Sequence, residues 1–511
     1  MSIGPGWPDT LILVLYLAAV LGISVAIARR QRTGEDYFLA GRTMGGRTLA
    51  FSMLANQASA VSLVGAPAFV ALREGGGLRW LQYELALPLA MLAVMTVLLP
   101  ALRSVGGASI YAYAEARYGA GTRRLLAAAF LLSRGLALGV ILYASALVVA
   151  RALGCSVENA LLGIGLFAVA YTSLGGITAD IWSDVLQLAV LWGGVLISGA
   201  FLLAKHGLGL LEAIPPERVR ALAPDALGMD ATSTFGLWPM LLGGFFLYVS
   251  YYGCDQSQAQ RLLAARSDAD ARRALLLNGL LRFPLVLTYC GLGLLLSGLL
   301  SVDAAFAARM AGQPADSLVP IFMTTYLPVG LRGLLLAAIL AAAMSSIDSA
   351  LNSLAAVTLE DLWGCSPAAQ NVWLSRGVSL AWGLFAVVAG LAFARSGAGV
   401  IELVNQVGSA FYGPILAVFA LGVLAPRVTG SAAILGLLAG LGANLALGVL
   451  APQVSWLWWN VSGLATAAGV ALGVARATLS PPPLRWPERA TVLLVGAFGA
   501  MVGLLLLLPW G

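Results

Sequence analysis

The sequence predicts an all-α, polytopic membrane protein with about fourteen transmembrane helices. Of its 511 residues, 60% are hydrophobic and 10% are charged, whereas soluble domains carry about a quarter charged residues. The mean hydropathy is +0.90. Apolar stretches long enough to cross about 30 Å of hydrocarbon recur along the whole chain. This composition excludes an ordinary soluble enzyme, a disordered protein and a nucleic-acid-binding protein.

The predicted segments follow one another with mostly short loops between them. They cover residues 8–29, 47–72, 78–102, 122–152, 156–175, 180–205, 236–256, 274–300, 326–361, 372–395, 399–424, 430–451, 455–475 and 488–509. With the N-terminus outside, the inside loops hold roughly twice as many basic residues as the outside loops, and one of them holds the arginines from Arg261 to Arg273. We therefore place both termini outside the cytoplasm, in a plasma membrane of the bacterial inner-membrane type.

Two of the predicted helices carry signals for a break. The second segment has Asn56-Gln57 in mid-membrane and Pro67 further on. Unwound backbone at that depth is tolerated where it lines a cavity. The seventh segment has Gly243-Gly244. This pair is consistent either with a helix break or with tight helix packing through small residues. We expect a functional break at Asn56-Gln57 and favour packing for the two glycines.

The spacing of the segments predicts an inverted repeat. Segments two to six (residues 47–205) and seven to eleven (236–424) form two sets of five, and each set opens with an interrupted helix. Because five is odd, the second set is inserted upside down relative to the first, as in many secondary transporters. Residues 1–46 then supply a first helix and a cytoplasmic loop, 206–235 an extracellular loop, and 425–511 three C-terminal helices.

The ninth segment has the densest cluster of polar side chains. One helix face carries Ser345, Asp348, Ser349 and Asn352, with Ser346 beside Ser349. Hard cations prefer oxygen ligands, so one carboxylate with several hydroxyls suits sodium. Alternatively, the serines bond to their own helix and Asp348 pairs with an arginine. The presence of an acid within the cluster favours cation binding.

Few other ionisable residues lie inside the segments, and such residues are usually functional. In the sixth segment we expect Asp180 at the membrane interface and Asp184 about one turn deeper, where it needs a cation, a proton or an arginine. Glu84 and Arg282 lie in the third and eighth segments. Three roles are open for each of the two residues: contact with a substrate, extension of the charge to the membrane interface, or an ion pair. The sequence does not decide among them.

Other chemistries find no support in the sequence. The four cysteines form no CxxC pair, which indicates neither a zinc site nor a disulfide framework. The only lysine, Lys205, does not end a glycine-rich loop, so a Walker A nucleotide site is excluded. His206 is the only histidine, and no catalytic constellation indicates an enzyme.

Four ordered motifs resemble those of the sodium/solute symporter family, which includes sodium–glucose, proline, pantothenate, monocarboxylate and sialic acid symporters. The motifs are Asp36-Tyr37-Phe38-Leu39-Ala40-Gly41-Arg42, Gly175-Gly176 through Trp182-Ser183-Asp184 to Gln187, Asp255-Gln256 with Gln260-Arg261, and Met344-Ser345-Ser346-Ile347-Asp348-Ser349. The resemblance covers residues 36–425. It implies a fold of the leucine-transporter type with a five-plus-five inverted repeat.

The resemblance also implies sodium sites. The main site would use the carbonyls of Leu54, Gln57 and Ala342 with the hydroxyls of Ser345 and Ser346. Family members of this type carry an aliphatic residue where Gln57 stands, and a carbonyl ligand survives that change. A second sodium ion, bound by some members, would fall on Asp184, Ser345, Asp348 and Ser349.

A solute site follows from the same resemblance. Its sugar-type positions map to Asn56, Val61, Glu84, Leu87, Tyr248, Arg282 and Gln406, and the gating aromatic maps to Tyr251. Val61 and Leu87 replace polar sugar contacts, and Arg282 replaces a lysine. Since arginine pairs bidentately with carboxylates, these changes favour a carboxylate or a vitamin over a sugar.

We therefore predict a sodium-coupled symporter that imports a small organic solute by alternating access and is not an enzyme. Its expected partners are the solute, sodium ions and the lipid bilayer, with no nucleic acid and no nucleotide. A proton-coupled transporter of the same fold, with Asp184 or Asp348 as the proton carrier, is the alternative.

Overall fold

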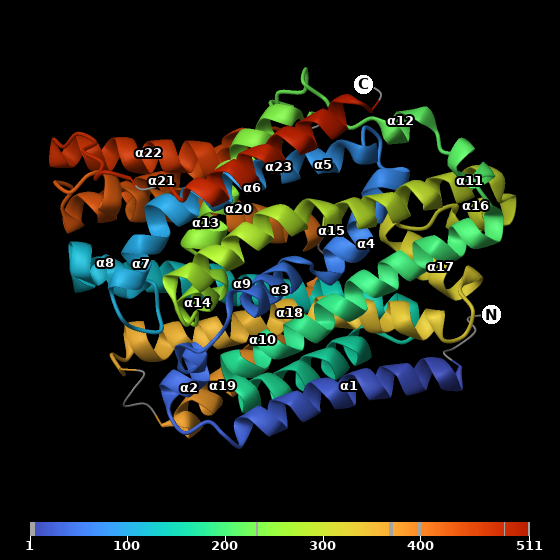
Figure 1. Cartoon of the computed structure of the whole chain (residues 1–511), viewed down its shortest axis with the longest axis horizontal. Helices are drawn as coiled ribbons and strands as arrows, with labels where there is room; N and C mark the ends of the chain where they lie inside the picture. Colours follow the sequence, from blue (N-terminus) through green and yellow to red (C-terminus); the bar gives the residue numbers. More distant parts are fainter. Residues whose placement is uncertain (1–5, 231–232, 367–370, 397–399, 485, 509–511) are drawn as a thin grey trace.

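In a computed structural model, the apolar stretches form long helices that run roughly side by side (Figure 1). Helices are expected there because hydrocarbon offers the backbone no other hydrogen-bond partner. The structure describes residues 6–230, 233–366, 371–396, 400–484 and 486–508, while the side chains of Val61 and of 395–407 lie outside this description. Within the described residues every regular element is helical.

The first part of the chain runs from α1 to α12. These helices are α1 (Trp7–Ala28), α2 (Gly34–Leu39), α3 (Gly46–Gln57), α4 (Ala60–Leu72), α5 (Leu81–Glu84), α6 (Ala86–Ala93), α7 (Leu99–Ser104), α8 (Tyr111–Tyr118), α9 (Ala120–Leu153), α10 (Val157–His206), α11 (Gly209–Glu212) and α12 (Pro216–Val219). A π-helical turn between α6 and α7 keeps α5 to α7 in one continuous membrane-length element, Gly77–Ser104.

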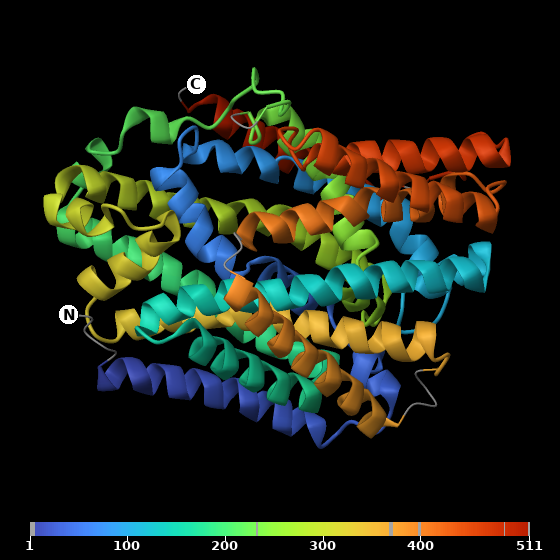
Figure 2. The ribbon, with the colours of Figure 1, turned by 180° about the vertical axis from the view of Figure 1, so that it is seen from behind.

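The second part runs from α13 to α23. These helices are α13 (Gly244–Gly253), α14 (Gln256–Leu263), α15 (Asp268–Val302), α16 (Ala304–Met310), α17 (Leu318–Tyr326), α18 (Leu331–Val357), α19 (Val372–Ser396), α20 (Val400–Leu424), α21 (Gly430–Leu450), α22 (Trp458–Ala475) and α23 (Glu488–Leu506). In both views α1 lies along one edge of the molecule, and α21 to α23 lie on the opposite side (Figures 1 and 2). Between them α18 is buried along almost its whole length.

Nine helices in the described part of the chain are long and apolar enough to cross a membrane, and the bent pair α3–α4 makes a tenth candidate. The multi-pass, all-α class is thereby confirmed. The number fourteen and the five-plus-five repeat stay predictions.

The break predicted after Asn56-Gln57 is confirmed. Helix α3 ends at Gln57, and α4 starts again at Ala60, bent by 57° from α3. The Ser59 hydroxyl accepts a hydrogen bond from Ser62 N at 3.2 Å and so caps the new helix. Because α4 begins at Ala60, soon after α3 ends at Gln57, only a short stretch of backbone carbonyls is left outside the two helices in the protein interior.

The seventh segment behaves differently. One π-helical turn, Pro239–Gly243, leads into α13, and Gly243 and Gly244 keep helical dihedrals. A Cβ on Gly243 would lie 2.4 Å from Leu457 O, and one on Gly244 would lie 2.9 Å from the Tyr83 ring. Close packing therefore explains both glycines, and the interruption of this segment lies further along, where α13 ends at Gly253 and α14 starts at Gln256.

The fifth and sixth predicted segments join into one helix, α10, with a kink at Gly176. The φ angle of Gly176 is +56°, which side-chain-bearing residues rarely adopt. A Cβ there would lie 2.5 Å from Tyr37 O, because α2 packs directly against the kink. The Gly175-Gly176 motif therefore shapes the start of the sixth segment, from which two acidic residues project.

Candidate functional site

The break after α3 meets the serine face of α18. Ser345 Oγ lies 3.1 Å from Ala55 O and 3.2 Å from Ala342 O, and Ser346 Oγ lies 3.3 Å from Asn56 O. Leu54 and Ala342 are fully buried and the two serines nearly so. The predicted cluster of carbonyls and hydroxyls is thus brought together, although the serines contact the carbonyls between Leu54 and Gln57 in the sequence.

The side chain of Gln57 is engaged elsewhere. The Tyr252 hydroxyl of α13 lies within hydrogen-bond distance of Gln57 Oε1 and 2.6 Å from Asn278 Oδ1 on α15. The side-chain amide of Gln57, which departs from the family pattern, is therefore hydrogen-bonded to Tyr252, outside the serine cluster. The backbone carbonyl of Gln57 stays at the helix break.

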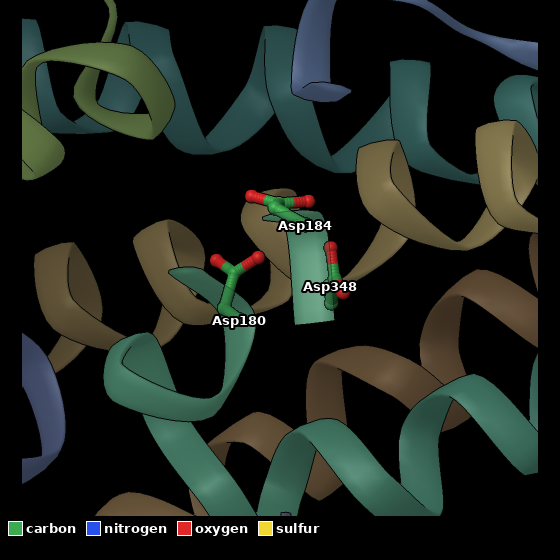
Figure 3. Close-up of side chains that lie close together, drawn as sticks. All are labelled: Asp180, Asp184 and Asp348. Atoms are coloured by element: carbon green, nitrogen blue, oxygen red, sulfur yellow. The ribbon is translucent and has the colours of Figure 1, made fainter. Parts of the chain in front are cut away.

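Three carboxylates form a second buried group close to the serines (Figure 3). Oxygens of Asp180, Asp184 and Asp348 lie within 4.8 Å of one another. Asp184 and Asp348 are fully buried, and Asp180 is 2% exposed. The expectation that Asp180 sits at the membrane interface is therefore wrong, because the kink at Gly176 turns the start of the sixth segment into the interior.

Arg261 enters this group from α14. Its Nη2 lies 3.1 Å from Asp180 Oδ1, 2.7 Å from Asp184 Oδ2 and 2.5 Å from Ser349 Oγ. The side chain is fully buried, so its assignment to a cytoplasmic loop by charge counting is wrong. Arg261 belongs to the polar interior that α10 and α18 share.

The group still has unused hydrogen-bonding capacity. Tyr171 donates to Asp348 Oδ2 at 2.6 Å and Ser52 to Asp184 Oδ2 at 2.5 Å. Asp184 Oδ1 and Asn352 Oδ1 are buried without a hydrogen-bond partner among the described residues. Among those residues Arg261 is the only basic side chain paired with the three acids. The excess of acid charge and the free oxygens fit a bound cation.

A cavity of about 510 Å³ opens beside the break. Five of the predicted solute residues line it: Asn56, Glu84, Tyr248, Tyr251 and Arg282. Ser346 and Gln57 also reach its wall. The side chain of Gln406 on α20 lies outside the described residues. The predicted solute positions and the serine cluster are therefore neighbours.

Glu84 and Arg282 form an ion pair in the cavity wall, with Arg282 Nε 3.5 Å from Glu84 Oε2. Tyr248 donates to Glu84 Oε1 at 3.3 Å. Both charged side chains are at least 93% buried. Arg282 Nε and Nη1 and both polar atoms of the Asn56 amide have no hydrogen-bond partner among the described residues. Such groups are normally satisfied, so they indicate where a solute or water binds.

A second ion pair, between Arg134 and Asp255, lies in the cavity wall, and the sequence alone did not indicate it as a site. Arg134 Nη1 lies 3.8 Å from Asp255 Oδ2, and Arg134 Nε has no hydrogen-bond partner among the described residues. Asp255 also caps α14, since its Oδ1 accepts from Ser257 N at 2.8 Å. An arginine in the middle of an apolar segment was the available signal, but the fold alone brings it to the cavity.

The cavity opens toward one end of the molecule. Phe235, Asp316 and Trp456, which lie in or next to loops predicted to be extracellular, are partly exposed and are among its lining residues. Burial raises the pKa of the Asp316 carboxyl, against the opposing charge of Arg151.

At the end predicted to be cytoplasmic, side chains from three elements are hydrogen-bonded to the loop at residues 107–110. Gly107 O accepts from Arg42 at 3.1 Å, Ala108 N donates to Glu360 at 2.7 Å, and Ile110 N donates to Gln256 at 2.9 Å. Three separate elements therefore hold this loop in place at the end predicted to be cytoplasmic.

Residues 37–440 match the family described as Sodium:solute symporter family. The chain belongs to this family. The match covers most of the 511 residues, and it confirms the resemblance drawn from the four motifs.

Several curated relatives are sodium-coupled transporters. The human sodium/iodide cotransporter is 30% identical over 85% of this chain and 68% of its own length. The sodium-coupled monocarboxylate transporter 1 of Xenopus laevis is 28% identical over 86% and 71%. The sodium-dependent multivitamin transporter of Oryctolagus cuniculus is 29% identical over 91% and 72%. These relatives support a transporter rather than an enzyme.

Solved structures share the fold. A Na+-coupled sialic acid symporter, described in a substrate-bound, outward-open state with a novel Na+ site, superposes with a TM-score of 0.83 at 22% identity, covering 94% of this chain and 99% of its own. A nucleobase-cation-symport-1 family transporter gives a TM-score of 0.57 at 15% identity, with 86% and 94% covered. The solved neighbours are transporters of the leucine-transporter fold, which confirms the general architecture.

Proposed function

We propose that this protein is a sodium-coupled symporter that imports a small organic anion by alternating access. The observation that carries the proposal is the contact between the serine face of α18 and the broken end of α3, directly beside the solute cavity. Backbone carbonyls freed by a helix break, together with hydroxyls, make an oxygen-only site of the kind sodium prefers. Family membership and the sodium-coupled relatives support the same ion.

The main sodium ion binds to the carbonyls of Leu54, Gln57 and Ala342 and to the hydroxyls of Ser345 and Ser346. Binding replaces the hydrogen bonds that the two hydroxyls now make to Ala55 O and Asn56 O. The ion ties α3 to α18 and favours the outward-open arrangement. A ligand shifts such an equilibrium only by its difference in affinity for the two states.

A second sodium ion binds at the acid group, on Asp184, Ser345, Asp348 and Ser349. The three carboxylates outnumber the guanidinium of Arg261, and burial of unpaired charge is costly. A cation at this point offsets the excess charge. Each sodium ion that enters also draws on the membrane potential, by about 2.3 kcal/mol per charge per 100 mV.

The solute binds in the cavity, in contact with Asn56, Glu84, Tyr248, Tyr251, Arg282 and Gln406. The relatives named for iodide and for monocarboxylates transport anions, and this cavity contains two arginines, Arg134 and Arg282. Each arginine has an acidic partner, lines the cavity and has at least one nitrogen without a hydrogen-bond partner among the described residues. These donors suit a carboxylate, which accepts paired hydrogen bonds from arginine.

We also propose the arrangement in the membrane. Fourteen helices contain the five-plus-five inverted repeat at residues 47–205 and 236–424, preceded by 1–46, joined by the extracellular loop 206–235 and followed by 425–511. Both termini lie outside a bacterial plasma membrane. Loop charge supports this orientation, and the cavity mouth lies at the predicted extracellular end.

Uptake into proteoliposomes tests the coupling. The purified protein is reconstituted, and the accumulation of labelled organic anions is measured with an inward sodium gradient. We expect accumulation that is lost when potassium replaces sodium. Equal uptake in potassium refutes the sodium coupling, and uptake that follows a pH gradient regardless of sodium supports proton coupling through Asp184 or Asp348.

A serine variant tests the site. Replacing both cluster serines, Ser345→Ala with Ser346→Ala, removes two oxygen ligands, and we expect the sodium concentration for half-maximal uptake to rise at least about tenfold. Ser353→Ala is the matched control, since Ser353 is also buried on α18 but its hydroxyl bonds only to Ala350 O, at 2.9 Å. Unchanged sodium dependence in the double variant places the ion elsewhere.

A further inference from the structure

Aromatic side chains form an unbroken path along the cavity wall. Starting from Phe235, ring centroids are 5.0 Å apart between Phe235 and Phe69, 5.2 Å between Phe69 and Trp80, 6.4 Å between Trp80 and Tyr83, and 4.8 Å between Tyr83 and Tyr248. All five residues line the cavity. We call these five residues the aromatic path. It ends where Tyr248 contacts Glu84.

Both ends of the aromatic path carry an arginine, but the two ends differ in how their polar groups are engaged. At its inner end lie the amide of Asn56 and the spare N–H groups of Arg282, which have no hydrogen-bond partner among the described residues. At its outer end, the guanidinium of Arg73 lies over the Phe235 ring at 4.6 Å. A ligand that matches this surface has a polar head on the inside and a flat apolar body that extends toward the mouth.

The size of the cavity points the same way. Its 510 Å³ falls within the range of about 300–1,000 Å³ that is common for sites of drug-sized ligands. Each heavy atom of a three-carbon acid occupies no more than the roughly 30 Å³ of a water molecule, so such an acid fills at most about a third of the space. A monatomic anion fills still less. The cavity therefore suits a considerably larger solute.

The backbone around the aromatic path is firmly held. Gln82 Nε2 lies 3.2 Å from Phe235 O, and Gln82 Oε1 accepts from Ala223 N at 2.9 Å. The connection between α10 and α13 is thereby fixed to the cavity rim at the point where Phe235 enters the wall. A wall that is already in place loses little freedom when a ligand binds.

We propose that the solute is a carboxylate with an aromatic or similarly flat apolar body, its carboxylate at the Asn56–Arg282 end of the cavity and its body along the aromatic path. This assignment rests on the proposed function, because it specifies which anions the symporter takes. It separates this chain from a carrier of small or monatomic anions. The contacts that select the solute are those of Tyr83, Trp80, Phe69 and Phe235 with its body.

The test compares solutes of increasing aromatic size. Binding of acetate, benzoate and 2-naphthoate to the purified protein in sodium is measured by calorimetry, with benzamide and benzylammonium as neutral and cationic counterparts of benzoate. We expect affinity to rise about tenfold or more from acetate to benzoate, and again to 2-naphthoate, as apolar surface is buried. Benzamide and benzylammonium should bind at least about tenfold more weakly than benzoate.

Variants of the aromatic path sharpen the test. Trp80→Leu and Phe235→Leu should each reduce the ratio of 2-naphthoate to acetate affinity at least about fivefold. Trp373→Leu is the control, since Trp373 is 68% exposed and lies outside the cavity. Stabilisation by sodium against thermal unfolding, measured on each variant, shows that it is folded.

The outcomes distinguish two failures. If sodium neither stabilises the protein nor promotes binding of any solute, the proposed function fails. If sodium stabilises the protein but acetate binds as tightly as 2-naphthoate, or benzylammonium binds better than benzoate, or none of the probes binds, the assignment of an aromatic carboxylate is overturned while sodium binding stands. Unchanged affinity ratios in both path variants overturn the role of the aromatic path.

Discussion

The Glu84–Arg282 pair lends itself to a double-mutant cycle, because the sequence left open whether these residues stabilise the fold or bind the solute. The variants are Glu84→Gln, Arg282→Gln and the combination. Glutamine removes the charge and stays polar; it is nearly isosteric with glutamate and shorter than arginine. The cycle therefore reports the charge interaction with little change in packing.

The expected magnitude follows from the geometry. Two unit charges 3.5 Å apart attract by about 5 kcal/mol at an effective dielectric constant of about 20, which suits a site whose side chains are at most 7% exposed. Removal of one partner leaves the other charge buried and unpaired, so each single variant should lose about 3–5 kcal/mol of stability. In the combined variant neither charge remains, and its loss should fall short of the sum of the singles by about 2–3 kcal/mol.

The assay is reversible unfolding of the purified protein in increasing dodecyl sulfate, with helical content as the signal. The pair Arg266–Asp270, at 2.6 Å, is the control at the start of α15, where Arg266 is 63% exposed and Asp270 is buried. Its contact is shorter but Arg266 is open to solvent, so its coupling should be far smaller than that of the buried pair. Additive losses for Glu84 and Arg282 would refute the assignment of a tight buried pair.

Solute affinity then separates the two roles. If the pair only stabilises the fold, the combined variant should bind anions as the unaltered protein does. We expect instead that the combined variant loses at least about tenfold in anion affinity, because Arg282 lines the cavity and two of its nitrogens have no hydrogen-bond partner among the described residues. Full retention of anion affinity would remove Arg282 from the solute site.

Three further predictions concern the elements that build the sites. Gly176→Ala should abolish or strongly reduce folded protein in expression trials, since its Cβ would lie 2.5 Å from Tyr37 O at a φ of +56°; Gly193→Ala on the same helix, where a Cβ meets open space, should express normally. Arg261→Gln should lower stability by about 3–5 kcal/mol in low sodium and by less in high sodium, when the cation compensates the acids; equal losses at both concentrations would contradict a cation site there. Burial raises the pKa of the Asp36 carboxyl, but backbone N–H donors outweigh this and hold it below its usual 3.8, so the charge stabilises above that value and the effect is lost only as pH falls through the lowered pKa. The stability cost of Asp36→Asn should therefore stay constant between about pH 5 and pH 8, and a cost that varies within this range would show that Asp36 titrates there.

Local signals predicted the broken helix and the serine cluster. Asn56 and Gln57 are out of place in a membrane segment, and the helix does end at Gln57. The serines of α18 recur at helical spacing, so their common face follows from the period alone. The contact between break and serines came from the family resemblance, because no sequence signal in one chain pairs residues about 290 positions apart.

The charged interior was predicted only in part. Asp184 and Asp348 lie inside apolar segments and were recognised. Arg261 and Asp180 lie at segment ends, where a charge ordinarily reaches water. The kink at Gly176 and the insertion of α14 bury them instead, and these are tertiary effects that hydropathy does not register. The aromatic path gave no signal either, since Phe69, Trp80 and Phe235 come from three elements that meet only in the fold.

Under the proposed function, the position of Asn56 couples the solute directly to sodium, because this one residue belongs to both proposed sites. Its carbonyl accepts a hydrogen bond from Ser346, its amide lines the cavity, and Ser346 also reaches the cavity wall. A cation that draws the carbonyls of this short stretch toward α18 fixes the direction of the Asn56 amide, and a solute that bonds to the amide fixes the carbonyls in return. By linkage the two effects on affinity are equal. The side-chain amide of Gln57, by which this chain differs from the family pattern, does not disturb this relation, because it is hydrogen-bonded to Tyr252.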